Sequence, residues 1–280
     1  MLSVPLVSRR AGRGIAALAV ATCALALTVM PAAAMVNGTS DGTRHPEVGM
    51  MGTARSDGTF QLACSGALIA PRVFLTAAHC VAATNRRDPS GVIYLWFGPG
   101  QQFGSVTTPG VVTGRGSIHP DYRADYRNDI AVVVLDEPYE LDAYAALPDT
   151  GFLDELQAAG GLGATLFTVV GYGTNEQQVI KKSGPVFYYT GERQYGVLGF
   201  NSLTKLWLNE TQNIAQGYQG ACYGDSGGPT FLGAGDGETD LLLAVTSTGD
   251  GPCYATNVGS RTDTPQARSW IQGFLDANAS

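Results

Sequence analysis

One glycine-rich stretch limits the possible folds of this chain more than any other: Cys222-Tyr-Gly-Asp-Ser-Gly-Gly-Pro229, with Ser226 near its centre. A serine hydroxyl becomes a nucleophile when a base reaches it and amide N–H groups can stabilise the product, and glycines permit the turn that exposes it. The stretch also fits G-x-S-x-G, a pattern typical of α/β-hydrolases. Those enzymes place the histidine after the serine, whereas His45, His79 and His119 all precede Ser226. The order of the residues therefore argues against that fold, and a surface turn without chemistry remains as the alternative.

The first 34 residues differ in composition from the rest. Arg9, Arg10 and Arg13 precede an apolar run at residues 15–30, which is followed by Pro31-Ala-Ala-Ala34. This pattern predicts a secretory signal peptide at residues 1–34, cut after Ala34, with an uncleaved membrane anchor as the alternative. Loss of the three arginines would change the formal charge from −7 to −10. Such an acidic chain argues against a nucleic-acid or membrane partner and favours a soluble secreted protein.

Four cysteines remain after Cys23 is removed with the signal peptide: Cys64, Cys80, Cys222 and Cys253. In an exported chain they predict two disulfides, for which three pairings are possible. A zinc site is the alternative, but no CxxC pair and no HxxxH spacing supports it.

Short apolar stretches alternate with turn residues along most of the chain. Their lengths suit strands better than helices, and the regular turns favour a sandwich or a barrel. Residues 147–163 are predicted to join two halves and to carry one helical turn at 154–159. The predicted strands are 48–51, 62–69, 73–78, 92–97, 111–113, 130–135, 166–170, 186–190, 205–208 and 241–247.

Only the last segment has a clear helical pattern. Thr264 is a plausible N-cap and Pro265 stands in the first turn. Five apolar residues share one face, as expected for a helix that packs on a core: Ala267, Trp270, Ile271, Phe274 and Leu275.

A histidine upstream of Ser226 is a candidate for the base that activates it. His79 follows the apolar stretch 74–78 and precedes Cys80, so a disulfide with Cys64 would hold it in the fixed place that a general base requires. His45 and His119 are each followed by proline and are predicted to be structural.

A carboxylate should then hold the imidazole in one tautomer. The candidates are Asp121, Asp125, Asp129 and Asp136. Asp129 is favoured because it directly precedes the unbroken apolar strand 130–135. A strand-capping aspartate without a catalytic role is the alternative.

Three motifs carry the histidine, the aspartate and the serine in this order along the chain: Thr76-Ala-Ala-His79-Cys80, Asn128-Asp-Ile-Ala131 and Gly224-Asp-Ser-Gly-Gly-Pro229. With them the chain resembles the chymotrypsin and trypsin family of serine proteases, as a bacterial-type secreted member. The resemblance covers essentially all of the mature chain. It implies an all-β fold of two antiparallel Greek-key β-barrels with the active site between them, plus a C-terminal helix. The protease domain would span 35–280, with barrels at about 35–150 and 151–262 and the helix at about 264–277.

The resemblance also assigns roles to individual residues. His79 would take the proton from Ser226, Asp129 would orient His79, and the amides of Gly224 and Ser226 would form the oxyanion hole. In the family a newly freed N-terminal amine pairs with the aspartate before the serine. Here that pair would be Met35 and Asp225, so the predicted signal cut would itself produce the active enzyme.

The same resemblance pairs Cys64 with Cys80 and Cys222 with Cys253, and lets Ser247 support Asp129. Gly220 stands where trypsin-like members carry an aspartate, which disfavours Lys or Arg at the cleavage site and favours an uncharged side chain. Asp250, Asn257 and Asp263 are candidates for altering the pocket. Thr248 replaces a tryptophan of many members. The substrate-pocket residues would be Gly220, Ala221, Tyr223, Ser247, Thr248 and Gly249.

The function expected from the sequence is therefore a secreted serine endopeptidase that forms an acyl-enzyme on protein or peptide substrates. We expect a monomer that needs no cofactor, and no residue is assigned to a metal site. A catalytically silent binding protein on the same fold is one alternative. Such proteins usually lack a residue of the catalytic triad, whereas this chain has all three. A narrow-specificity esterase or processing enzyme is the other.

Overall fold

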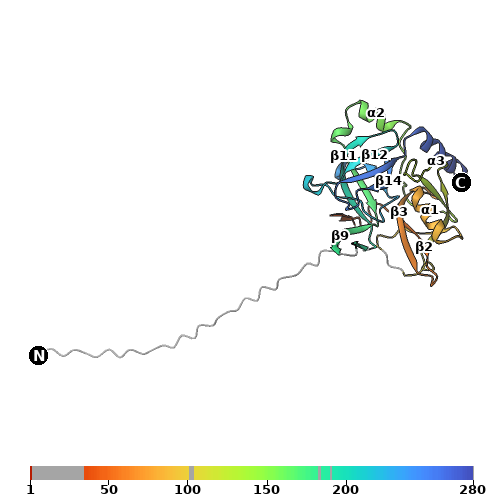
Figure 1. Cartoon of the computed structure of the whole chain (residues 1–280), viewed down its shortest axis with the longest axis horizontal. Helices are drawn as coiled ribbons and strands as arrows, with labels where there is room; N and C mark the ends of the chain where they lie inside the picture. Colours follow the sequence, from red (N-terminus) through yellow and green to blue (C-terminus); the bar gives the residue numbers. More distant parts are fainter. Residues whose placement is uncertain (2–34, 101–103, 182–183, 190, 280) are drawn as a thin grey trace. The chain divides into compact units, whose positions relative to one another are not determined.

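The computed structural model describes residue 1 and residues 35–100, 104–181, 184–189 and 191–279 (Figure 1). Apart from Met1, the expected signal peptide lies outside the described residues. Between residues 35 and 279 the chain forms mostly strands, which build two barrels. No helix in the described part of the chain is long and apolar enough to cross a membrane.

The first barrel is closed and antiparallel, in the order β2-β3-β4-β7-β6-β5. Most of its strands are short and apolar, and side chains such as Phe74, Leu75 and Ile93 are fully buried. The strands are β2 (Val48–Ala54), β3 (Phe60–Ala70), β4 (Val73–Thr76), β5 (Val92–Trp96), β6 (Val112–Ile118) and β7 (Ala131–Leu135).

The second barrel has the order β11-β12-β15-β14-β13-β8 and closes through pairing of β11 with β8. A short strand, β1 (Thr39–Ser40), adds to β11, and β9 (Thr174–Lys181) pairs with β10 (Gly184–Tyr189) as a separate hairpin. The barrel strands are β8 (Leu166–Gly171), β11 (Gln194–Leu203), β12 (Trp207–Thr211), β13 (Pro229–Leu232), β14 (Leu242–Gly249) and β15 (Thr256–Arg261).

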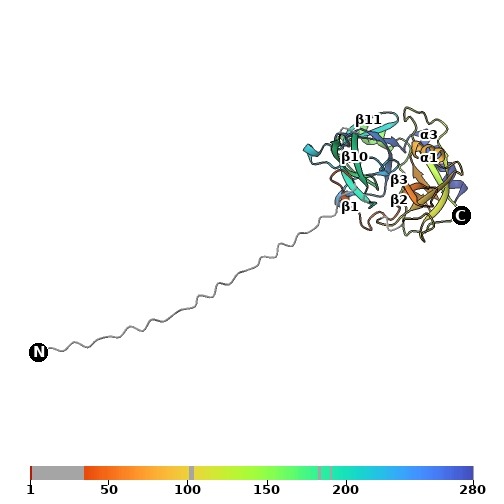
Figure 2. The ribbon, with the colours of Figure 1, turned by 60° about the horizontal axis from the view of Figure 1, so that its bottom comes forward.

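The described chain has three α-helices: α1 (Ala78–Arg87), α2 (Phe152–Ala158) and α3 (Pro265–Ala277). Short 3-10 turns occupy Leu162–Ala164, Ile214–Gln216 and Gly235–Gly237. Helix α3 begins as predicted, since the Thr264 side chain accepts a hydrogen bond from Ala267 N. Although α3 follows the second barrel in sequence, it lies near α1 (Figure 2), and Ala267 and Ile271 belong to the hydrophobic cluster that contains most of the first barrel's core. The predicted fold class, two antiparallel barrels with a C-terminal helix, is confirmed.

One element differs from the prediction near the site. The predicted strand 73–78 ends at Thr76, and Ala78 and His79 already belong to α1. Alanine suits a helix as well as a buried strand, so the apolar run does not show where the strand stops.

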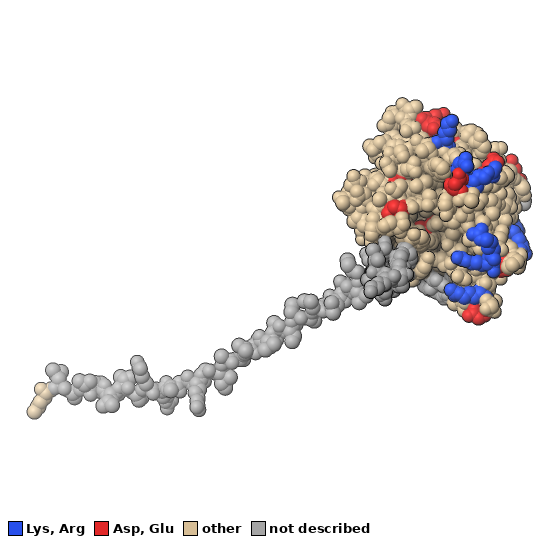
Figure 3. Space-filling model, viewed as in Figure 1, with Lys and Arg blue, Asp and Glu red and all other residues tan. Residues whose placement is uncertain are grey.

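Charged residues are sparse on the face shown in Figure 3. Toward the top right of that face basic and acidic side chains lie beside one another, and at the lower right basic side chains predominate.

Candidate active site

His79 and Asp129 form a tight pair that both barrels hold in place. The Asp129 carboxylate lies 2.7 Å from His79 Nδ1 and accepts a hydrogen bond from His79 N at 2.8 Å. Ser247 Oγ, on β14, donates to the same carboxylate at 2.5 Å, and Asp129 N donates to Ser260 Oγ on β15 at 3.1 Å. Asp129 is fully buried. Its hydrogen bonds offset the cost of taking a carboxylate out of water.

The loop that carries Ser226 depends on two glycines with left-handed backbone angles, Gly224 at φ 100° and Gly227 at φ 83°. Two contacts fix it to β3: Ser65 N donates to Ser226 O at 2.8 Å, and Ser65 Oγ donates to Gly224 O at 2.9 Å. Within the described residues, the amides of Gly224 and Ser226 donate to no protein group. This loop therefore holds two backbone donors available for a ligand.

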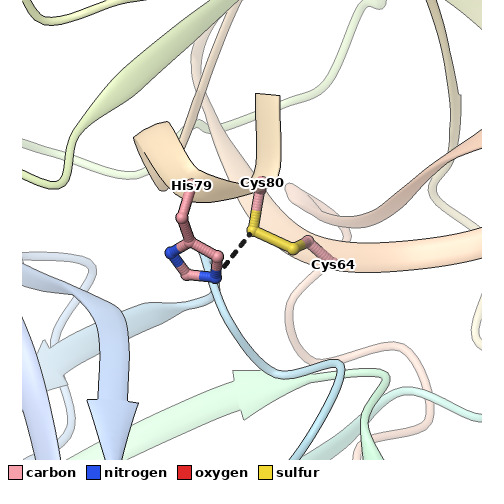
Figure 4. Close-up of side chains that lie close together, drawn as sticks. All are labelled: Cys64, His79 and Cys80. Carbon is pink, nitrogen blue, oxygen red and sulfur yellow. Dashed lines mark hydrogen bonds between the residues drawn. A yellow bond between two sulfur atoms is a disulfide. The ribbon is translucent and has the colours of Figure 1, made fainter. Parts of the chain in front are cut away.

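Ser226 and His79 line one pocket of about 340 Å³. No hydrogen bond joins them among the described residues; His79 Nε2 lies instead 3.5 Å from Cys80 Sγ (Figure 4). The sulfur of Cys80 is bonded to that of Cys64, and the second disulfide joins Cys222 to Cys253. The group Cys64, His79 and Cys80 is close enough to surround an ion. Because its two sulfurs form a disulfide, it offers no thiolate ligand.

The structure does not join Met35 to Asp225. Met35 N is a peptide amide that donates to Gln194 Oε1 at 2.9 Å, and the Met35 side chain is fully buried. The Asp225 carboxylate accepts hydrogen bonds from Gly173 N and Cys222 N, both at 2.8 Å. Burial outweighs these bonds and raises the pKa of Asp225 to about 7.

Most of the expected pocket residues line the cavity: Ala221, Tyr223, Ser247, Thr248 and Gly249, together with Asp250 and Asn257. Gly220 is not among them. A Cβ on Gly220 would lie 2.9 Å from Gln212 Oε1, so the carboxamide of Gln212 takes the place of a side chain there. Asp263 is also away from the pocket, because it pairs with Arg261 and accepts a hydrogen bond from Leu153 N.

Sequence reasoning missed several contributors. Tyr126 lines the pocket with its ring edge-on to His79, at a centroid distance of 5.6 Å. Its backbone has φ 66°, which is unusual for a tyrosine, and its loop position left no pattern to find. Ser65 and Ser260 reach the site through tertiary contacts alone. In contrast, Ser247 was identified through the family resemblance.

The other two histidines lie outside the pocket. His45 Nδ1 lies 2.5 Å from Asp41 Oδ1 and its Nε2 lies 2.6 Å from Glu238 Oε1. Burial lowers the pKa of His45, but the bonds to these carboxylates outweigh it and raise the value to about 9. His119 packs edge-on against Trp270, and burial lowers its pKa.

Comparison with known proteins points to one family. A family model described as Trypsin matches residues 36–271. The chain is 29% identical over 252 residues to the Spaetzle-processing enzyme of Drosophila melanogaster, covering 78% of this chain and 60% of that protein. It is 27% identical over 250 residues to vitamin K-dependent protein C of Rattus norvegicus, covering 78% and 47%.

The fibrinolytic enzyme isozyme C of Lumbricus rubellus is 27% identical over 233 residues, covering 78% of this chain and 90% of that protein. The chain thus spans less than two thirds of the first two relatives and most of the third. All three come from animals, which gives no support to a bacterial-type member.

Proposed function

Because the chain belongs to the trypsin family of serine proteases, we propose that it is a secreted endopeptidase that cleaves peptide bonds through Ser226, His79 and Asp129. One observation carries the proposal. His79, held by the buried Asp129, shares a pocket with Ser226, whose loop holds two amides that donate to no group in the described part of the chain.

The reaction would follow from these positions. Ser226 Oγ attacks the carbonyl carbon of the scissile bond and gives its proton to His79 Nε2, while Asp129 stabilises the imidazolium. The carbonyl oxygen becomes an oxyanion that accepts hydrogen bonds from Gly224 N and Ser226 N. The C–N bond then breaks, and His79 gives the proton to the leaving amine. Water attacks the ester with His79 again as base, which releases the acid and restores Ser226.

This reaction requires His79 Nε2 to leave the neighbourhood of Cys80 Sγ and bond to Ser226 Oγ. Hydrogen bonds between catalytic groups commonly tighten only when substrate is present. The contact of His79 Nδ1 with Asp129 would restrain the ring during this reorientation.

The substrate would be a protein or peptide with an uncharged side chain at P1, the residue that supplies the scissile carbonyl. Gly220 provides no carboxylate for Lys or Arg, and the carboxamide of Gln212 stands beside it. We expect a monomer that is secreted after the cut at Ala34, needs no cofactor and binds neither nucleic acid nor membrane.

The test is covalent labelling by an organophosphonate that reacts with activated serines. We expect one phosphonate per molecule of the mature protein, read by intact mass. The label should be lost in Ser226→Ala and retained in Ser90→Ala, an exposed serine outside the pocket. Peptidase activity should fall about a millionfold in Ser226→Ala. An unlabelled but folded mature protein would instead support the binding-protein alternative.

A further inference from the structure

One wall of the pocket contains a deeply buried carboxamide. Asn257, on β15, is 2% exposed and is the most buried polar side chain of the described pocket lining. It faces Glu210 across the pairing of β15 with β12. This wall of the pocket thus belongs to the second barrel, where pairing of β12 with β15 holds the backbone of both strands.

The partner of Asn257 determines which end of its amide is available. Asn257 Nδ2 donates to Glu210 Oε2 at 2.7 Å. Asn257 Oδ1 accepts no hydrogen bond from any described residue, which leaves a carbonyl oxygen for an occupant of the pocket. Gln212 Oε1, beside Gly220, is a second buried oxygen without a partner among the described residues. Asn257 Oδ1 is thus the acceptor open to an occupant of the pocket, while Gln212 places a further unpaired acceptor beside Gly220, outside the described lining.

The charges near this wall do not suit an ionic side chain. Asp250 is the one carboxylate among the described lining residues, and its oxygens already accept from the amides of Tyr254, Ala255 and Thr256. None of the described lining residues is Lys or Arg. Burial raises the pKa of Glu210 to about 8, so this group is mostly neutral at pH 7. An anionic P1 side chain lacks a cation here, and a cationic one would meet only Asp250, whose oxygens are already held by backbone amides.

From these contacts we propose that Asn257 is a specificity-determining residue, whose Oδ1 accepts a hydrogen bond from the carboxamide N–H of glutamine or asparagine at P1. The inference rests on the proposed peptidase function and names the substrate class of the same pocket. A carboxamide is uncharged and carries two N–H donors. A buried carbonyl that would otherwise stay unpaired favours such an occupant over an apolar one of equal size.

The experiment compares four peptides that differ only at P1: Gln, Met, Glu and Lys. The mature enzyme is titrated with the phosphonate to count active sites, and the cleaved bond is located by mass spectrometry. We expect kcat/KM to be highest for Gln and lowest for Glu. A carboxylate has no hydrogen to donate to Asn257 Oδ1 and would bring a negative charge next to that oxygen. In Asn257→Leu the Gln-to-Met ratio of kcat/KM should fall about tenfold. This ratio is internal to each variant and so does not depend on the fraction that folds.

Glu210→Gln is the matched control. Its side-chain carbonyl can still accept from Asn257 Nδ2, so the Gln-to-Met ratio should stay within about twofold of the original. A preference for Glu or Lys over Gln, or an unchanged ratio in Asn257→Leu, would overturn the assignment while leaving the peptidase function intact. Absence of both labelling and cleavage in the unaltered enzyme would overturn the proposed function, and this inference with it.

Discussion

His45 lies outside the pocket in a cluster of charged side chains. Its two ring nitrogens contact Asp41 and Glu238, and Arg44 and Arg193 pair with the same two carboxylates. Glu47, buried nearby, also favours the charged imidazole. The cluster joins the segment between β1 and β2, the residue that precedes β11 and the loop before β14. Protonated His45 is therefore part of the contact between these segments.

We expect this histidine to stabilise the fold below its ordinary pKa of 6.5 and to lose that contribution as pH rises through about 9, because the folded state raises the pKa. The measurement uses a Ser226→Ala background, which prevents self-digestion. There, His45→Gln should lower the free energy of unfolding by a few kcal/mol near pH 6 and by progressively less toward pH 9.5. Chemical denaturation measures the difference.

His119→Gln is the contrasting control. Burial lowers the pKa of His119, so its charged form is disfavoured in the folded state and its effect should not shrink toward high pH. A pH-independent cost for His45→Gln would contradict the proposed role of its charge.

Helix α3 illustrates how one element ties distant parts of the chain together. Ile271 is fully buried in the core of the first barrel, and Trp270 stacks edge-on with His119 in the loop that leads to Asp129. The helix thus supports the loop from which the site receives its carboxylate.

We expect Ile271→Ala to lower the free energy of unfolding by about 2–4 kcal/mol, because it removes buried methyl groups and leaves a cavity. Gln272→Ala, on the exposed face of the same helix, should change it by less than about 0.5 kcal/mol. Equal effects of the two substitutions would show that α3 is not packed as described.

Sequence patterns predicted the elements that are apolar along their length and missed those that are not. Strand β7 was found because Ala131–Leu135 is an unbroken apolar run. Strand β15 was missed because its buried positions include Asn257, Ser260 and Arg261, which interrupt the apolar pattern expected of a buried strand. Likewise, Asp129 stands in a local motif that a sequence reveals, whereas the Gln212–Gly220 contact depends on tertiary structure.

At the scale of the whole molecule, the buried start of the described chain bears on activation. Met35 and Val36 are fully buried, and Val36 pairs with Gly220 next to the pocket. Asp225 is also buried and lacks a cation among the described residues. A free amine at Met35 would supply one, at the place where signal cleavage is expected to create it.

We predict that the secreted protein starts at Met35, which intact-mass measurement checks directly. Ala34→Leu, which replaces the small residue that signal peptidase requires, should prevent that cut and leave a protein that the phosphonate does not label. A mature start several residues away, or full labelling of the Ala34→Leu protein, would refute this mode of activation.

The return of α3 to the first barrel also has a consequence for biogenesis. Helix α3 contributes to a hydrophobic cluster whose other members emerge from the ribosome much earlier. The leading half cannot reach its finished packing until α3 has also emerged, so its maturation waits for synthesis of the second barrel.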